Sequence, residues 1–459
     1  MKKAICILLG IVLAALLSIS GSAVFSKGKS VSQKKMVGKP IAPWTEGCLD
    51  IHFINTISGE CYYIIFPDGT DMLVDAAGSS QETGPFGDPA NGFSNEGVRS
   101  RWDPMKEKLD CGEFISEYIR KCKSWTGNDT LNYALVSHFH CDHIGNVYDE
   151  PSGKTDAYRR QSWATILENF PVGLNLDRAY PDYDFPFERM DTVVDGLGNY
   201  LSAVKWHTEH SGMQAGRFIP GVNDQIVLKR HPEKYPDFQI RNICANGELW
   251  TGRGTQTKQC FPSKEEINAK MTCPTSHIKK DDFCPNGNAL SCMFKLSYGD
   301  FDFAGFGDAS FTGAGTYAWK DIESPAAAVC GQVEVFKADH HGSTATNGTD
   351  TRRRKSGVFG NAMFSLNPQC WIICGYTDVH PRKETMENVI RNLPATDIYT
   401  LNSCPKIEAY EGYDTHVKGA NGHIVFRVQP GGKKYNVFVL SDSDRKMTVK
   451  SVSGDYVCR

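Results

Sequence analysis

The segment at residues 137–143, Ser-His-Phe-His-Cys-Asp-His, is the densest group of side chains in this chain that could do chemistry. Imidazoles and carboxylates are the usual protein ligands of zinc and similar divalent cations. If the segment continues a strand, alternation places His138 and His140 on one side, and the adjacent Asp142 and His143 turn toward a second position. One short loop can therefore supply ligands to two metal ions.

Three further residues complete a candidate ligand set, and each of them follows an apolar strand. They are Asp308, after Gly305-Phe306-Gly307; His341, in Asp339-His340-His341-Gly342-Ser343; and His380, before Pro381. Polar residues at the ends of separate strands are how a rigid sheet projects ligands into one site. We therefore expect these three residues to join the segment at 137–143.

His207 is the alternative to His341 as the histidine that completes the first metal site. The apolar spacing over residues 200–210 is closer to that of a helix than to that of a strand, so we favour His341. His340 either contacts the substrate or bonds only to the backbone. The thiol of Cys141 should point away from the metals, because alternation places it opposite the flanking histidines.

Apolar and alternating runs predict the elements that position these residues. Strands are expected at residues 49–54, 61–66, 72–75, 133–137, 240–245, 248–251, 291–297, 301–305, 333–338, 370–374, 424–428 and 435–440. Helical spacing marks 114–123 and 384–392, and Asn246-Gly247 is typical of a hairpin turn. The strand at 133–137 runs directly into the histidine segment.

The N-terminus has the pattern of an export signal. Lys2-Lys3 precedes an uncharged apolar run over Ala4–Leu17, and small residues favour cleavage after Ala23. The run is shorter than the roughly 20 residues that span a bilayer, so we expect cleavage, no stable membrane insertion, and a secreted or periplasmic protein. Residues 24–47 are interpreted as an exposed leader and 48–459 as one catalytic domain.

Composition and charge restrict the partners. The 459 residues are 40% hydrophobic and 22% charged, as in ordinary globular proteins, and the formal net charge is −3. A mildly acidic chain is no general polyanion binder, so contact with nucleic acid needs a local basic patch. Arg352-Arg353-Arg354-Lys355 is such a patch; it is either a solvated loop or lies over the cleft and attracts an anionic substrate.

Sixteen cysteines are many for this length, and Cys6 lies in the signal. Cys260, Cys273, Cys284 and Cys292 cluster in a Gly/Pro/Lys-rich stretch, without the paired C-x-x-C spacing of a structural zinc site. We expect disulfides that staple a surface insertion at about 252–288, near the cleft.

The His-x-His-x-Asp-His pattern after a strand resembles the metallo-β-lactamase superfamily. The order of the remaining parts is similar to the soluble domain of ComEC-type competence proteins and to phosphorylcholine esterases of the same fold. Those parts are Pro67-Asp68-Gly69 with Leu73-Val74-Asp75, then Gly307-Asp308, Lys337-x-x-His340-His341-Gly342-Ser343 and His380-Pro381. The resemblance covers about residues 49–445 and implies an αββα sandwich, with two packed β-sheets and helices outside.

The resemblance also implies how two divalent metal ions would be held. His138, His140 and His341 would bind one ion, Asp142, His143 and His380 the other, and Asp308 would bridge them, with Asp75 orienting the cluster from behind. ComEC-type domains often carry Asp where His140 stands, so this chain looks more like a full dizinc binder. It lacks their multi-helix channel, which argues against DNA uptake. Zinc suits the histidines, and manganese or iron would also fit.

The expected reaction is hydrolysis by a metal-bridging hydroxide, with Asp142, Asp308 and His340 as catalytic residues. Lys337 and Ser343 could bind a phosphate, which together with the resemblance favours phosphodiesters, either nucleic acid or phosphorylcholine-like esters. Hydrolysis of carboxylic esters, lactones or β-lactams is the alternative. A non-catalytic metal-containing binding protein is a third reading, and the complete ligand set argues against it because structural zinc sites are closed and four-coordinate.

Overall fold

The computed structural model describes residues 35–57, 59–77, 111–188, 194, 196–272, 282–310, 317–344, 346–348, 361–375 and 380–459. The predicted export signal, the basic run at 352–355 and Cys273 lie outside the described residues.

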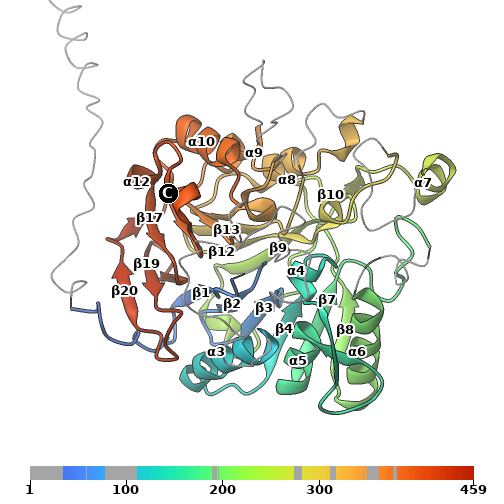
Figure 1. The fold of residues 1–459 in the computed structure, drawn as a ribbon, viewed down its shortest axis with the longest axis horizontal. Coiled ribbons are helices and arrows are strands. Elements are labelled where there is room, and N and C mark those ends of the chain that lie inside the picture. Colours follow the sequence, from blue (N-terminus) through green and yellow to red (C-terminus); the bar gives the residue numbers. More distant parts are fainter. Residues whose placement is uncertain are drawn as a thin grey trace, which may run out of the picture.

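Two large β-sheets form the centre of the molecule (Figure 1). The first has the strand order β20-β19-β18-β1-β2-β3-β4-β7-β8, with β21 paired to β19. Its strands are β1 (Leu49–Phe53), β2 (Tyr62–Ile65), β3 (Asp71–Val74), β4 (Leu131–Leu135), β7 (Val172–Asp177), β8 (Gln214–Arg217), β18 (His423–Val428), β19 (Lys434–Leu440), β20 (Val449–Val452) and β21 (Tyr456–Val457). The N-terminal meander therefore pairs with the C-terminal strands, because β1 lies between β2 and β18.

The second sheet has the order β11-β10-β9-β12-β13-β14-β15-β16-β17. Its strands are β9 (Phe238–Ala245), β10 (Glu248–Trp250), β11 (Thr257–Gln259), β12 (Met293–Tyr298), β13 (Phe301–Gly305), β14 (Val335–Lys337), β15 (Cys370–Ile373), β16 (Asp397–Thr400) and β17 (Val417–Ala420). From β13 to β17 the neighbours run parallel. The carboxyl ends of β13, β14 and β15 therefore meet at one edge. A separate two-stranded sheet pairs β5 (Val147–Pro151) with β6 (Arg159–Gln161).

Helices cover the outer face of each sheet (Figure 1). The first sheet carries α3 (Cys111–Thr126), α5 (Ser162–Asn169) and α6 (Leu197–His210); the second carries α8 (Glu323–Cys330), α9 (Asn361–Leu366) and α10 (Lys383–Asn392). Shorter helices are α4 (Cys141–Ile144), α7 (Lys264–Lys270), α11 (Pro405–Glu408) and α12 (Tyr413–His416), with 3-10 turns η3 (Pro232–Lys234), η4 (Asn288–Leu290), η5 (Ala318–Lys320) and η6 (Asp339–Gly342). In the part of the chain that the structure describes, no helix combines the length and apolarity needed to cross a bilayer.

Strand alternation divides the apolar side chains into three layers. In β2, Tyr62 and Ile64 face the space between the sheets, whereas Tyr63 and Ile65 pack with the helices of the first sheet. β15 shows the same alternation as β2. Ile372 points between the sheets, and the residues on either side of it pack with the helices of the second sheet. The αββα sandwich predicted from the sequence is therefore confirmed.

Most predicted elements are present within a few residues of their expected bounds, and the region around His207 is helical as expected, in α6. The hairpin between β9 and β10 turns at Asn246 and Gly247, whose φ angles of 51° and 75° are left-handed. Such angles are what a two-residue hairpin turn with an Asn-Gly pair requires.

The disulfide staples predicted for the cysteine-rich insertion are not found among the described residues. Cys260, Cys284 and Cys292 are free thiols. Cys292 is 1% exposed and packs between the two sheets. Cys292 therefore packs as a small apolar residue of the core.

Candidate metal centre

The first half of the site lies where β3 and β4 end in the first sheet. β3 ends at Val74, and Asp75 follows with a left-handed φ of 55°. β4 runs into the histidine segment, in which Asp142 and His143 belong to the short helix α4. Asp75 and His143 are fully buried and Asp142 is 4% exposed. Two apolar strands thus hold a polar loop inside the protein.

The second half lies where strands of the second sheet end. Asp308 follows β13, and His340 and His341 follow β14 with left-handed φ angles of 46° and 55°. Such angles are uncommon for residues with a side chain and cluster at functional sites. The Asn347 side chain holds this turn, because it accepts from the amide of Asp339 at 3.0 Å and donates to its carbonyl at 2.9 Å.

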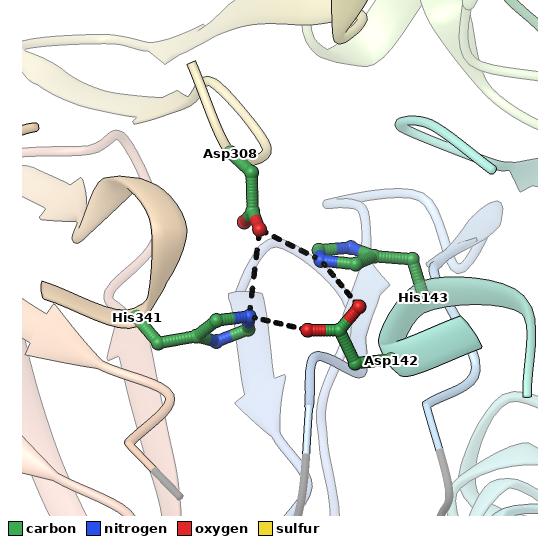
Figure 2. A group of neighbouring side chains, drawn as sticks. All are labelled: Asp142, His143, Asp308 and His341. Carbon is green, nitrogen blue, oxygen red and sulfur yellow. Dashed lines mark hydrogen bonds and ion pairs between the residues drawn. The ribbon is translucent and has the colours of Figure 1, made fainter. Parts of the chain in front are cut away.

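Asp142, His143, Asp308 and His341 point toward one centre (Figure 2). Each offers one ligand atom, and these atoms all lie within 4.8 Å of one another. Nε2 of His341 lies 3.2 Å from Oδ2 of Asp142, and Nε2 of His143 lies 3.2 Å from Oδ2 of Asp308. The two sheets therefore bring four of the seven predicted ligands into one cluster.

The carboxylate of Asp308 is the centre of this arrangement. Its Oδ2 lies 3.2 Å from Nε2 of His143, 3.6 Å from that of His341, and 3.9 Å from those of His138 and His340. Within the described part of the chain, neither carboxylate oxygen of Asp308 has a hydrogen-bond partner, and neither does Nε2 of His138 or His143. Buried polar atoms are normally hydrogen-bonded, so this group of donor atoms fits a cation.

The charges of the cluster shift the pKa values of its members in opposite directions. Burial alone would raise the pKa of Asp308, but His143 and His341 outweigh burial and hold it well below its usual value. Burial alone would lower the pKa of His143, but Asp308 and Asp75 hold it well above its usual value. Burial lowers the pKa of His138. The carboxylates thus depend on nearby positive charge, which a divalent cation would supply.

Hydrogen bonds behind the cluster determine which imidazole nitrogen faces it. Nδ1 of His143 lies 2.7 Å from Oδ2 of Asp75, and Nδ1 of His341 lies 2.9 Å from the carbonyl oxygen of Cys374. Both partners only accept, so each Nδ1 donates and Nε2 is the nitrogen available to a cation. Asp75 also accepts from the amide and hydroxyl of Ser137 at 2.7 and 2.6 Å. This is the placement that an orienting role for Asp75 requires.

The other three predicted ligands lie around the group of four. The His138 ring centroid is 4.0 Å from that of His143 and 4.6 Å from that of His140. His380 is 5% exposed, and its ring centroid is 6.2 Å from that of His341. The seven-ligand assignment therefore stays a prediction, with four ligands assembled and three beside them.

The end of the cysteine-rich insertion, which the sequence analysis places on the surface near the cleft, forms one wall of the site. Nδ2 of Asn288 lies 3.3 Å from each ring nitrogen of His340, whose side chain is 29% exposed. Burial lowers the pKa of His340 to about 4. A Cβ at Gly287 would lie 2.5 Å from Nε2 of His140, so any larger residue there would displace that ring. No sequence signal singled out these two insertion residues.

The ammonium group of Lys337 lies in the interior and contacts groups of the protein itself. It is fully buried, contacts the carboxylate of Glu60, donates to the carbonyl of Gly307 at 2.6 Å, and lies 3.9 Å from Oδ1 of Asp308. Ser343 is 7% exposed, and its carbonyl accepts from two neighbouring threonines. Lys337 thus makes structural contacts, and the phosphate-binding role expected of Lys337 and Ser343 stays a prediction.

Glu60 is the main residue that the sequence argument missed. It is fully buried, and it belongs to a second group of ligand atoms with Asp75 and His143. Its position two residues before an apolar strand, comparable to that of Asp75 directly after one, was the available signal.

His207 lies in α6, and its Nε2 is 2.9 Å from the hydroxyl of Tyr158. Burial lowers its pKa to about 4. It belongs to neither group of ligand atoms found in the described residues. The structure therefore brings His341 into the cluster and leaves His207 with a structural hydrogen bond.

Comparisons with known proteins give distant structural likenesses. No protein-family model matches the chain, and no curated protein matches it. Similar solved structures include a mutant of CmlA beta-hydroxylase (9% identity, 84% of this chain and 55% of that one, TM-score 0.37). A second is CmlA, a diiron beta-hydroxylase from Streptomyces venezuelae (10% identity, 84% of this chain and 55% of that one, TM-score 0.36). A third is a candidate metal-dependent hydrolase from Parabacteroides distasonis (10% identity, 77% of this chain and 92% of that one, TM-score 0.33). The chain spans 55% of the length of the CmlA structures, and the assignment of the site therefore depends on its own geometry.

Proposed function

We propose that this protein is a dinuclear metal-dependent hydrolase of the metallo-β-lactamase superfamily and that it acts on phosphodiesters. The observation that carries the proposal is the carboxylate of Asp308, which is buried, lacks a hydrogen-bond partner among the described residues, and has four imidazole nitrogens within 3.9 Å of one oxygen. A carboxylate that bridges two cations must lie close to the nitrogen ligands of both, and Asp308 has this position.

The residues divide into two ligand groups with one shared member. His138, His140 and His341 would hold one cation, and Asp142, His143 and His380 the other, with Asp308 between them. Zinc suits these nitrogen and oxygen donors, and manganese or iron would also fit. Two bound divalent cations would lower the pKa of a shared water and polarise the ester oxygen of a substrate.

The chain's own residues prepare this chemistry. Asp75 and the carbonyl of Cys374 hold the Nδ1 protons of His143 and His341, which keeps both Nε2 atoms directed at the centre. His340 has the most exposed side chain of the residues around Asp308, at 29%. We propose that it contacts the substrate and that Asn288 orients its ring. Asp308, His143 and His341 are fully buried, which strengthens each electrostatic interaction among them.

The choice of phosphodiesters rests on the order of motifs that resembles ComEC-type domains and phosphorylcholine esterases. The substrate would be an anionic small molecule or a polymer such as nucleic acid. We further propose that residues 1–23 direct export, so that the enzyme meets this substrate outside the cytoplasm.

The test is a side-by-side assay of the purified chain with a bis-phosphodiester chromogen, DNA, a phosphorylcholine ester and a cephalosporin, each with added Zn²⁺ or Mn²⁺. We expect metal-dependent turnover of at least one of the first three substrates, and loss of it in His143→Ala. Turnover of the cephalosporin alone would point to β-lactam or ester hydrolysis. Metal binding without turnover of any substrate would favour a binding protein.

A further inference from the structure

Glu60 and Lys337 form an ion pair at the point where the two sheets meet the candidate metal centre. Glu60 lies two residues before β2 in the first sheet, and Lys337 is the last residue of β14 in the second. Both side chains are fully buried, and their charged groups are in direct contact. In β14, Val335 faces the space between the sheets, and by alternation Lys337 points the same way. The pair therefore crosses from one sheet to the other.

Each partner also contacts a backbone segment that carries predicted ligands. The amide of Glu60 donates to the carbonyl of Asp142 at 2.9 Å. Lys337 donates to the carbonyl of Gly307 at 2.6 Å, immediately before Asp308. A continuous chain of contacts thus runs from Asp142 through the ion pair to Asp308, and these two carboxylates belong to opposite halves of the site.

The close packing around Glu60 leaves this chain of contacts little room to shift. A Cβ at the preceding Gly59, whose φ is +88°, would lie 2.3 Å from the carbonyl oxygen of Asp142. The ammonium group of Lys337 also lies 3.9 Å from Oδ1 of Asp308, so its charge acts directly on that carboxylate.

Fold stability is a weak reason for such a pair. Desolvating two charges costs about as much as their attraction returns, and buried ion pairs are often replaced by apolar residues without loss of stability. Glu60 lies near Asp75 and His143, and its Oε2 contacts the ammonium group of Lys337. A role in spacing the two halves of the site explains both the burial and the position.

We propose that Glu60 and Lys337 are positioning residues that clamp the two sheets and set the distance between the Asp142 and Asp308 ligand groups. The inference rests on the proposed function, since it assigns the clamp to the same metal centre. Neither residue would touch the substrate; they would act through the two carboxylates.

The test compares metal binding by the full-length chain and three sets of variants. Lys337→Met alone strands a buried carboxylate and could unfold the protein. The double variant Glu60→Leu with Lys337→Met removes both charges at similar volume. A matched control is Asp71→Leu with Lys123→Met, because this buried pair joins β3 to α3 at 2.5 Å and contacts no predicted ligand. Melting temperature, Zn²⁺ affinity by competition with a chelator, and kcat and KM are measured for each.

We expect the clamp double variant to stay folded and to bind at least one of two Zn²⁺ ions about 10- to 100-fold more weakly, as is usual when residues behind metal ligands are removed. kcat should fall with little change in KM, and the control double variant should keep wild-type affinity. Wild-type affinity for both ions in the clamp double variant would overturn the inference while leaving the proposed function intact. A wild-type chain that binds no Zn²⁺, Mn²⁺ or Fe²⁺ would overturn the proposed function itself.

Discussion

Replacement of Asp75 by asparagine tests how the protein presents His143 to a metal. Oδ2 of Asp75 lies 2.7 Å from Nδ1 of His143 and accepts the Ser137 hydroxyl at 2.6 Å, and Oδ1 accepts the Ser137 amide at 2.7 Å. The asparagine side chain can keep the contact with the Ser137 amide through its oxygen, but its NH2 group then faces His143. Because that NH2 only donates, Nδ1 of His143 must become the acceptor, and the proton moves to Nε2, the nitrogen that lies 3.2 Å from Asp308.

Metal binding then requires removal of a proton from the wrong nitrogen. We expect Asp75→Asn to weaken Zn²⁺ binding about 10- to 100-fold, which corresponds to about 1.4 to 2.7 kcal/mol. The assay is calorimetric titration of the metal-free chain with Zn²⁺, read beside far-ultraviolet circular dichroism.

Asp71→Asn is the matched control, because Asp71 lies at the opposite end of β3 and accepts from Lys123 and Tyr63. This variant should lose stability and keep the metal affinity. An Asp75→Asn protein that binds Zn²⁺ within about twofold of the wild type, far less than the loss expected for a residue behind a metal ligand, would refute the tautomer argument.

Three further predictions concern a wall of the site, a competing histidine and acid stability. Gly287→Ala should push the His140 ring aside and lower metal affinity severalfold, whereas the control Gly153→Ala should leave the affinity unchanged. Equal affinities of the two variants in the titration would contradict the inference that the insertion forms a wall of the site. His207→Ala should leave metal content unchanged by elemental analysis, and a lost ion would restore His207 as a ligand. Burial alone would raise the pKa of Asp50, but Arg427 and a neighbouring histidine lower it to about 2, against 3.8 when unperturbed. Asp50 therefore contributes about 2 kcal/mol of stability above about pH 4, and this contribution is lost as the pH falls toward 2. In urea unfolding, the difference in the free energy of unfolding between wild type and Asp50→Asn should shrink over this range.

Much of the fold could be predicted because its strands carry a simple signal. β2 and β15 are short runs rich in β-branched and aromatic residues, β1 and β13 alternate apolar and polar residues, and both hairpin and helix signals were local. Pairing of β1 with β18 could not be read this way, because it joins Ile51 to Phe426 across most of the chain.

The site was partly predictable for a different reason. Asp142, His143, Asp308 and His341 are residue types with obvious metal chemistry, and each follows a strand or lies in the turn after one. The ion pair of Lys337 could not be predicted, because a lysine beside two histidines suggests an anion site and only the packed sheets show Glu60 opposite it.

The sequence places the insertion near the cleft, but it could not show which insertion residues contact the site, because composition reports on exposure and not on the path of a long loop. Gly287 and Asn288 lie against His140 and His340, although the stretch that contains them has the Gly/Pro/Lys content of a surface loop. The cysteines of the same stretch suggested disulfides, but Cys292 packs in the core as a thiol. Only the tertiary contacts show which residues of this stretch line the site and which cysteine packs in the core.

The most direct test of a dinuclear centre is anomalous diffraction from crystals of the full-length chain grown with Zn²⁺, with data on both sides of the zinc absorption edge. We predict two peaks, both within ligand distance of Asp308, one also beside His341 and the other beside Asp142 and His143. A map with no peak at Asp308, or with a single closed four-coordinate ion elsewhere in the molecule, would contradict the account.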